Sequence, residues 1–242
     1  MKSLLLCSTT LLAAVSLMAA DKDDVTSAAQ KLAAADNYSW TTKREGGQNA
    51  AGTTSKGKAQ KDGLAWIEMT VRDNTVEGYV KSGKGAVKTE DGWQAVDLTA
   101  PARGGGGGGG GGRAPGGMLR NFKAPAAQAE DIIGKTKAIA KDGDAYAGEL
   151  TEEGAKSLFP MGGGRRGGGG GGGAAPTVSD AKGSVKFWIT DGVISKFELK
   201  VSGKTKNRDG DDVDRSMTTT VEIKDIGTTK IEVPDDAKSK LS

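Results

Sequence analysis

The chain has 242 residues, and its 34 basic and 31 acidic side chains give a small formal net charge of +3. This balance excludes the strongly basic surface typical of nucleic-acid-binding proteins. The sequence has no histidine and one cysteine, Cys7. Histidine-based catalysis, ordinary zinc sites and internal disulfides are therefore excluded. We expect a protein that is not an enzyme and that uses no cofactor.

The first twenty residues have the pattern of a secretory signal peptide. Lys2 supplies a positive charge, an apolar run follows from Ser3 to Met18, and the chain turns polar at Asp21. The run is shorter than the ~20 apolar residues that cross a bilayer. Cys7 comes too early to be a lipid-anchored cysteine. We therefore predict a cleaved signal peptide at 1–20 and a periplasmic or extracellular protein with no transmembrane span.

Residues 21–242 are expected to form one domain that two glycine-rich segments interrupt. Nine consecutive glycines occupy 104–112, and a second tract covers 162–173. Polyglycine loses the most backbone entropy on ordering and buries no side chain in return. We therefore expect mobile loops at about 101–117 and 161–175. The arginines around these tracts are too few for an RNA-binding segment, and no RNA-binding fold accompanies them.

Most of the domain has the alternating apolar pattern of β-strands. Asp-Gly pairs, which suit type I′ hairpin turns, begin at Asp62, Asp91, Asp142, Asp191 and Asp209. The segments that flank these turns predict ten or eleven antiparallel strands. These strands lie at about 51–60, 64–72, 76–80, 85–89, 93–96, 135–140, 145–150, 185–189, 193–201, 217–223 and 228–233.

Helices are expected in only a few places. An alanine-rich segment from Asp24 to Ala35 has an apolar face, and Ala126 to Ile133 follows Pro125, a favourable first helical residue. Thr151 is a plausible N-cap for a short helix that ends at Leu158. A terminal turn of helix is expected within 234–241. The predicted fold class is mainly β (α+β), with a large antiparallel sheet and a few helices against one face.

This order of elements resembles the lipoprotein-carrier superfamily of the bacterial envelope, the LolA, LolB and LppX-like proteins. The resemblance implies a sheet curled into an incomplete barrel, helices against its concave face, and an apolar cavity for a lipid or lipoprotein acyl chain. It also points to an arginine on an early strand, where Arg44 and Arg72 are candidates by position. The residues that carry the resemblance are Asn37–Trp40, Gly183–Phe197, Val221–Gly227 and Ile231–Pro234.

Large apolar side chains on the expected strands are the candidates for lining such a cavity. Trp66 and Trp188 each lie out of phase with the aliphatic face of their strand, which indicates that the second face of the sheet is covered as well. For any one aromatic residue, an ordinary place in the sheet core is the competing interpretation. The cavity candidates are Trp40, Trp66, Met69, Trp93, Phe187, Trp188 and Phe197.

Two functions remain open from the sequence. The first is an exported, non-catalytic binding protein with an apolar cavity for a lipid or acyl chain. The second is an envelope structural or interaction protein without a ligand cavity, whose partners are other envelope proteins. The acidic segment from Asn207 to Asp214 does not have the ligand spacing of an EF-hand loop, so we expect a solvated hairpin turn there and no metal site.

Overall fold

The structure is a computed structural model. It describes residues 10–47, 52–71, 74–100, 116–120, 122–159, 178–207 and 210–242, with side chains from Ala20 onward except at positions 71, 74, 116 and 118. Most of the predicted signal peptide, nearly all of both predicted glycine-rich loops and the turn at Asp209 lie outside these residues.

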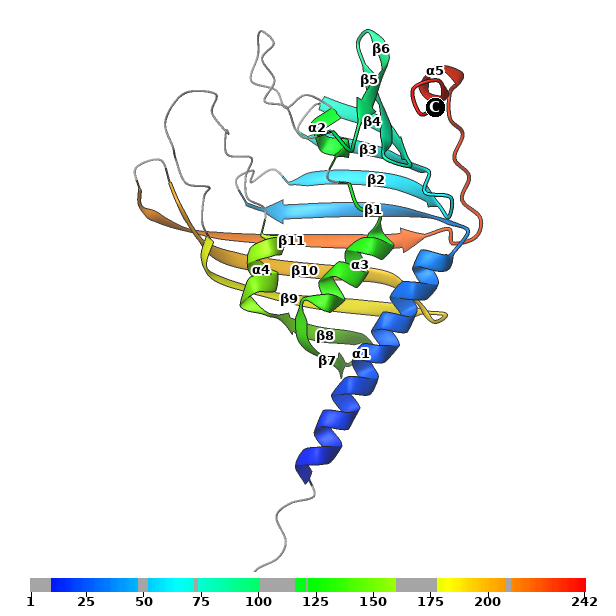
Figure 1. The fold of residues 1–242 in the computed structure, drawn as a ribbon. Helices are drawn as coiled ribbons and strands as arrows, with labels where there is room; N and C mark the ends of the chain where they lie inside the picture. Colours follow the sequence, from blue (N-terminus) through cyan, green and yellow to red (C-terminus); the bar gives the residue numbers. More distant parts are fainter. Residues whose placement is uncertain are drawn as a thin grey trace, which may run out of the picture.

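Eleven strands form a single antiparallel sheet, in the order β6-β5-β4-β3-β2-β1-β11-β10-β9-β8-β7 (Figure 1). The sheet is curved but open, with β6 at one edge and β7 at the other. The predicted antiparallel incomplete barrel is therefore confirmed. The strands are β1 (Asn37–Gly46), β2 (Thr53–Gln60), β3 (Ala65–Val71), β4 (Asn74–Lys81), β5 (Lys84–Thr89), β6 (Gly92–Asp97), β7 (Thr136–Asp142), β8 (Ala145–Leu150), β9 (Val178–Thr190), β10 (Val193–Lys206) and β11 (Asp212–Lys224).

The helices α1 (Thr10–Ala34), α2 (Gly116–Leu119), α3 (Pro125–Gly134) and α4 (Glu152–Leu158) lie on the concave side of this sheet, which we call the inner face (Figure 1). A short α5 (Asp235–Lys238) follows the last strand. The Thr151 hydroxyl accepts a hydrogen bond from the Gly154 amide at 2.9 Å, as predicted for an N-cap. Helix α1 begins earlier than expected, so the predicted cleavage position after residue 20 falls within it.

Only part of the turn prediction holds. Asp191 and Gly192 both have positive φ, at 53° and 75°, as a type I′ turn requires. At Asp62-Gly63, Asp91-Gly92 and Asp142-Gly143 only the glycine has a positive φ, so the type I′ prediction is wrong for these three turns. A Ser-Gly pair between β4 and β5 supplies another turn with two positive φ values, Ser82 at 48° and Gly83 at 80°.

The strand expected at 228–233 is absent. Thr228 lies in a turn, and 229–234 has no strand pairing. This segment instead crosses the side of the sheet opposite the inner face, which we call the outer face. Its apolar side chains Ile231 and Val233 pack there against a small cluster that includes Tyr79 and Ala86. An alternating apolar pattern therefore also suits an extended segment that packs one side on a sheet without pairing as a strand.

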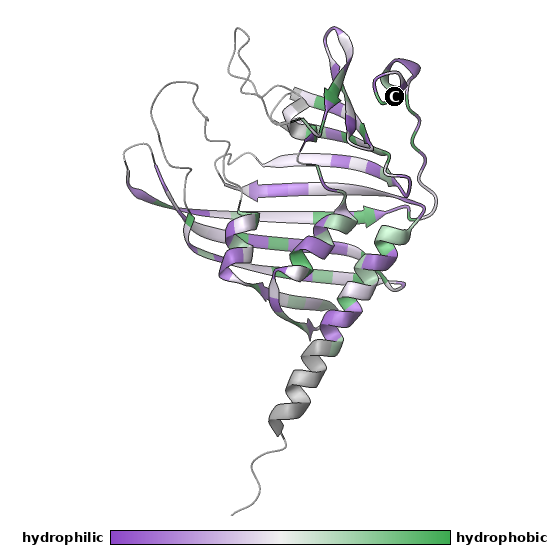
Figure 2. Ribbon diagram, in the orientation of Figure 1, coloured by the Kyte–Doolittle hydropathy of each residue, from purple (hydrophilic) through white to green (hydrophobic). Residues whose placement is uncertain are grey.

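The main core lies between the inner face and the helices. Strand residues alternate between buried and exposed positions, and Figure 2 shows the same alternation of apolar and polar residues along the long strands. Helix α1 contributes Val25, Ala29 and Leu32, each 0% exposed. Burial of these side chains, at about 25 cal/mol per Å² of apolar surface, holds α1 against the sheet.

Candidate functional site

Helices α1 and α4 pack closely on one half of the inner face, the half formed by β7 to β10. Phe187 on β9 and Phe197 on β10 are 0% and 1% exposed there, with ring centroids 6.1 Å apart. These two cavity candidates therefore lie in the packed core.

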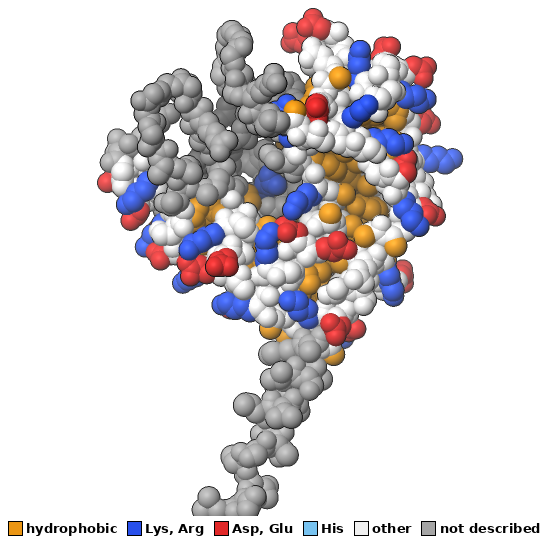
Figure 3. Space-filling view, viewed as in Figure 1, with side chains coloured by type: hydrophobic (Ala, Val, Ile, Leu, Met, Phe, Trp, Pro, Cys, Tyr) orange, Lys and Arg blue, Asp and Glu red, His pale blue; other side chains and the backbone are white. Residues whose placement is uncertain are grey.

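The other half of the inner face, from β1 to β5, is covered differently. The four-residue α2 packs on β5, and its Leu119 fits against two glycines that leave room for it. A Cβ atom at Gly78 would lie 2.9 Å from Leu119 Cδ1, and one at Gly85 would lie 3.4 Å from the same atom. Figure 3 shows apolar side chains gathered in a hollow between the β4–β6 end of the sheet and helices α1 and α3.

Trp40 on β1 lies at the centre of this half. Its ring stacks on Phe122, with centroids 5.8 Å apart and an interplanar angle of 21°. Gly57 on β2 provides the space for the indole, because a Cβ there would collide with the Trp40 ring. Tyr38 lies 5.9 Å from Trp40, accepts a hydrogen bond from the Ala126 amide at 3.4 Å, and so joins β1 to α3. Burial raises the pKa of Tyr38, which keeps this phenol neutral.

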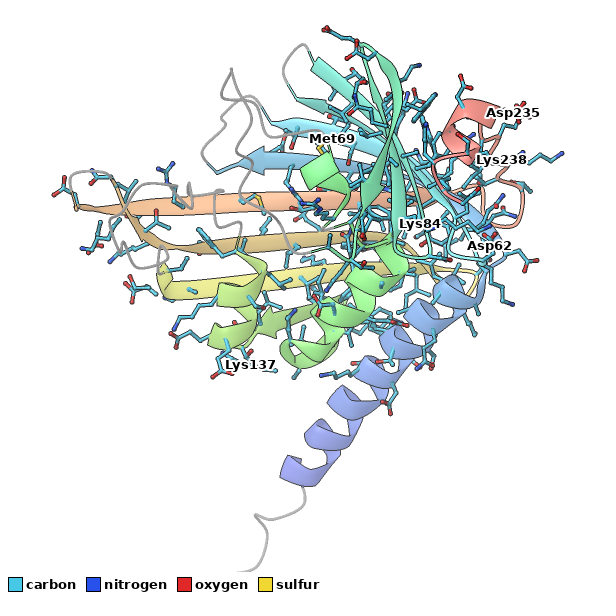
Figure 4. The ribbon with its side chains drawn as sticks, turned by 45° about the horizontal axis from the view of Figure 1, so that its top comes forward. Asp62, Met69, Lys84, Lys137, Asp235 and Lys238 are labelled. Atoms are coloured by element: carbon cyan, nitrogen blue, oxygen red, sulfur yellow. The ribbon has the colours of Figure 1, made fainter. Side chains whose placement is uncertain are left out.

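We call this surface the inner site. Its side chains are apolar except for the Tyr38 hydroxyl, and all but Met69 and Phe122 are buried, at 2–8% exposed. The residues that define it are Tyr38, Trp40, Ile67, Met69, Val80, Val87, Leu119 and Phe122. Met69 on β3 is partly buried and carries the most polarizable side chain of the group (Figure 4). A surface of this composition can bind an apolar group by burial and can do no acid–base chemistry.

Three of the seven cavity candidates lie on the outer face. Strand alternation places Trp66, Trp93 and Trp188 on the outer face, because each lies next to a strand residue that faces inward. Trp66 and Trp93 pack against the cluster under the C-terminal segment. Trp188 lies under the Lys196 ammonium, which is 4.7 Å from the ring centroid. Therefore the seven candidates are not brought together, although four of them share the inner face.

Trp66 faces a hollow of about 520 Å³ between β2–β4 and the C-terminal segment. Its indole N–H donates to Glu77 Oε1 at 2.9 Å, and the Tyr79 hydroxyl donates to the Glu232 carbonyl at 3.0 Å. Lys58 Nζ donates to the Lys230 carbonyl at 3.1 Å. Burial, and secondarily the Glu77 carboxylate, raise the pKa of Tyr79. These bonds anchor the C-terminal segment to the outer face.

A second hollow, of about 430 Å³, lies at the far ends of β9 to β11 and is polar. Lys204 and Asp180 form an ion pair across it at 3.2 Å, and this hydrogen bond raises the pKa of Lys204. Among the described residues, no group of three or more His, Cys, Asp or Glu side chains could hold a metal ion. Asn207 and Asp211 bond one another across the start of the predicted hairpin turn.

Of the two arginines that the resemblance points to, Arg44 lies within the described residues. Arg44 lies on β1 opposite Thr53 and Thr219, on the same strand face as Trp40. The residue as a whole is exposed, but partial burial of its guanidinium lowers the Arg44 pKa. Arg72 lies outside the described residues. No helix among those described is long and apolar enough to span a membrane.

No family model matches the chain, and no curated protein does. Three solved structures are similar to it. LprF from Mycobacterium bovis has a TM-score of 0.44 and 13% identity, over 90% of this chain and 98% of that one. A LolA superfamily protein from Nitrosomonas europaea has a TM-score of 0.31 and 9% identity, over 90% and 96%. A DUF1329 family protein from Desulfovibrio piger has a TM-score of 0.35 and 11% identity, over 90% and 95%.

One of these three structures carries the name of the superfamily that the sequence resembles. The sheet order and the helix positions define the architecture of this chain in their own right: an open, curved antiparallel sheet with helices on its concave side.

Proposed function

We propose that the protein is an exported, non-catalytic binding protein that holds a lipid or a lipoprotein acyl chain at the inner site. The observation that carries this proposal is the unequal cover of the inner face. One half is covered by α1 and α4, whereas the β1–β5 half is covered by the short α2 and the connection before α3, next to the apolar hollow seen in Figure 3. Six of the eight residues of the inner site are buried beneath this cover, so a ligand would enter by displacing it. Concave apolar surfaces of this kind are the usual sites for apolar ligands.

Binding at the inner site would rest on burial alone. Trp40, Phe122 and Met69 offer aromatic and thioether surface, and no charged side chain is needed to neutralise an acyl chain. Each methylene removed from water contributes about 0.8 kcal/mol, so a long acyl chain gains enough to offset its own ordering. We place this activity in the periplasm or outside the cell, after removal of the signal peptide, with envelope proteins as partners.

The contacts of α1 are compatible with cleavage after residue 20. The described side-chain bonds from this helix to the sheet begin with Asp21, which accepts from the Lys141 amide at 3.0 Å, and Lys22, which donates to the Thr136 carbonyl at 3.3 Å. An acidic residue in the first turn of the shortened helix would also be favourable. A new N-terminus at Asp21 would therefore keep these bonds.

The test is native mass spectrometry with lipid extraction on protein purified from an envelope fraction. We expect a stoichiometric lipid that is lost in Phe122→Glu, which puts a carboxylate beside Trp40. The matched control is Trp188→Glu, on the outer face, which should keep the lipid. Circular dichroism checks that both variants fold. An apo mass for the parent protein, with no uptake of a fluorescent fatty acid at micromolar concentration, would contradict the proposal and favour the structural or interaction role.

A further inference from the structure

The two edges of the open sheet are built very differently. At the β7 edge, the pairing with β8 is interrupted by an irregularity between Thr136 and Ile139. The carboxylate of Asp21 accepts a hydrogen bond from the Lys141 backbone amide at 3.0 Å, and Lys22 Nζ donates one to the Thr136 carbonyl at 3.3 Å. Bulges, lysines and a covering helix are the devices by which proteins prevent a sheet edge from pairing with another chain.

Within the described residues, β6 has no bulge and no lysine, and the short α5 packs on its outer face beside β5 without covering its edge in the manner of α1 at β7. The six residues of β6 pair regularly with β5, and Asp97 is the only charged residue among them. The Asp97 carboxylate is itself occupied, since it accepts from the backbone amides of Thr99 at 2.8 Å and Ala100 at 3.1 Å. Gln94 and Ala95 are exposed. This edge is therefore open, regular and nearly uncharged.

The hydrogen-bond alternation fixes which backbone groups point outward. The Leu98 amide donates to the Gly83 carbonyl at 2.9 Å, and bonded and non-bonded positions alternate along an antiparallel pair. Trp93, Ala95 and Asp97 therefore direct their amide and carbonyl groups away from β5. Arg120 Nε donates to the Asp97 carbonyl at 3.4 Å. The backbone groups of Trp93 and Ala95 that point away from β5 meet no other strand among the described residues.

We propose that β6 pairs antiparallel with β6 of a second copy of this chain, about a twofold axis at Gln94. This register sets Trp93 against Ala95 of the second copy, so that both available residues on each strand exchange backbone bonds. It pairs a large side chain with a small one on the outer face, where Trp93 already packs on Tyr79 at 5.3 Å. The apolar clusters of the two outer faces then become continuous.

Gln94 favours a second copy over an unrelated strand. A side-chain amide both donates and accepts hydrogen bonds, so two glutamines facing each other across a twofold axis are self-complementary. A lysine or a carboxylate at that position would instead face the same charge on the second copy. This inference does not depend on lipid binding at the inner site, because β6 lies at the edge of the sheet and Gln94 is exposed.

Light scattering after size-exclusion chromatography of the full chain, expressed so that its host processes it, tests the proposal. We expect the mass to double as the concentration rises. The Ala95→Lys variant should have the molar mass of one chain at every concentration. Ala138→Lys, an exposed alanine on the other edge strand, should leave the doubling unchanged. A mass of one chain at every concentration would overturn the proposal, and so would a dimer that both variants leave intact.

A cysteine variant keeps the test decisive if Ala95→Lys does not fold. In the proposed register, Gln94 faces Gln94 of the second copy at a non-hydrogen-bonded position, where Cα atoms lie about 4.5 Å apart. That spacing allows a disulfide. Gln94→Cys should therefore form a covalent dimer on mild oxidation, whereas Ala138→Cys and the parent chain, with its single Cys7, should not. Equal crosslinking in all three would refute this pairing.

Discussion

The two halves of the sheet differ in how many of their faces are covered. From β7 to β10 the cover is on the inner face, where α1 and α4 fill the concavity and the outer face is largely polar. From β3 to β6 there is cover on both faces: α2 lies within the concavity, and the C-terminal segment with α5 lies on the outer face. Figure 4 shows α5, marked by Asp235 and Lys238, at this end of the sheet, far from Lys137 on β7.

The two halves also differ in the length of the elements that cover and form them. In the β7–β10 half these are the part of α1 after the predicted cleavage position, residues 21–34, and the 13- and 14-residue strands β9 and β10. The β1–β5 half depends on a four-residue helix inside and on a segment without regular pairing outside. The apolar inner site lies in this second half, where the cover consists of short elements.

The largest effect is expected in the packed half. Phe187→Ala removes a ring that is 0% exposed and should lower the free energy of unfolding by about 3–5 kcal/mol. The neighbouring Trp188→Ala loses a cation–π contact on the outer face and should cost about 1 kcal/mol or less. Urea unfolding measures both. Equal losses would contradict the assignment of the two residues to opposite faces.

A smaller effect is expected where α5 meets the outer face. Ala237 is 0% exposed and packs with Tyr79 and Ala86, so Ala237→Asp buries a carboxylate without a partner and should cost about 2 kcal/mol. Acrylamide should then quench tryptophan fluorescence more strongly, since Trp66 and Trp93 lie under this segment. Lys238→Ala, an exposed change in the same helix, is the control. If quenching is unchanged in Ala237→Asp, the segment does not shield these tryptophans.

The smallest effect concerns the loop between β2 and β3. The Lys81 ammonium, 2.8 Å from Asp62 Oδ2, and the Leu64 amide hold the pKa of the Asp62 carboxyl below its usual range. A lowered folded-state pKa contributes stability above the unfolded-state pKa, and this contribution is lost as the pH falls through the folded-state value. Asp62 is exposed, so the contribution is a few tenths of a kcal/mol.

Asp62→Asn should therefore be slightly less stable than the parent protein at pH 7, and the difference should shrink below about pH 4. Urea unfolding at neutral and acid pH measures it. Lys81→Gln removes the main partner of Asp62 and should reproduce most of the effect. A difference that stays constant with pH would mean that the ion pair does not act as described.

Much of the fold could be predicted from local patterns. Alternation located the strands, Thr151 located the start of α4, and Pro125 located the start of α3. Helix α2 was not predicted, because its sequence Gly-Gly-Met-Leu has poor intrinsic helix propensity. It is positioned by the insertion of Leu119 between Gly78 and Gly85, a contact between residues far apart in the chain.

The candidate site could be predicted only in part, for a related reason. Alternation correctly separated Trp66 from Ile67 and Trp188 from Phe187, and it indicated that the outer face was covered. It could not identify the cover, which is the C-terminal segment at Trp66 and the Lys196 side chain at Trp188. The same limit applies to Trp40, whose partner Phe122 lies in the connection before α3.

Local sequence was enough to show which residues share a strand face, where the chain reverses, and that histidine and disulfide chemistry are absent from residues 21–242. These properties depend on neighbours in the chain and on composition. The tertiary structure alone decided which face each helix covers, which half of the concavity is filled, and which sheet edge stays open. Those properties depend on packing between segments far apart in the chain. A periodic pattern shows which face of a segment is apolar, but it does not identify the segment that packs on that face.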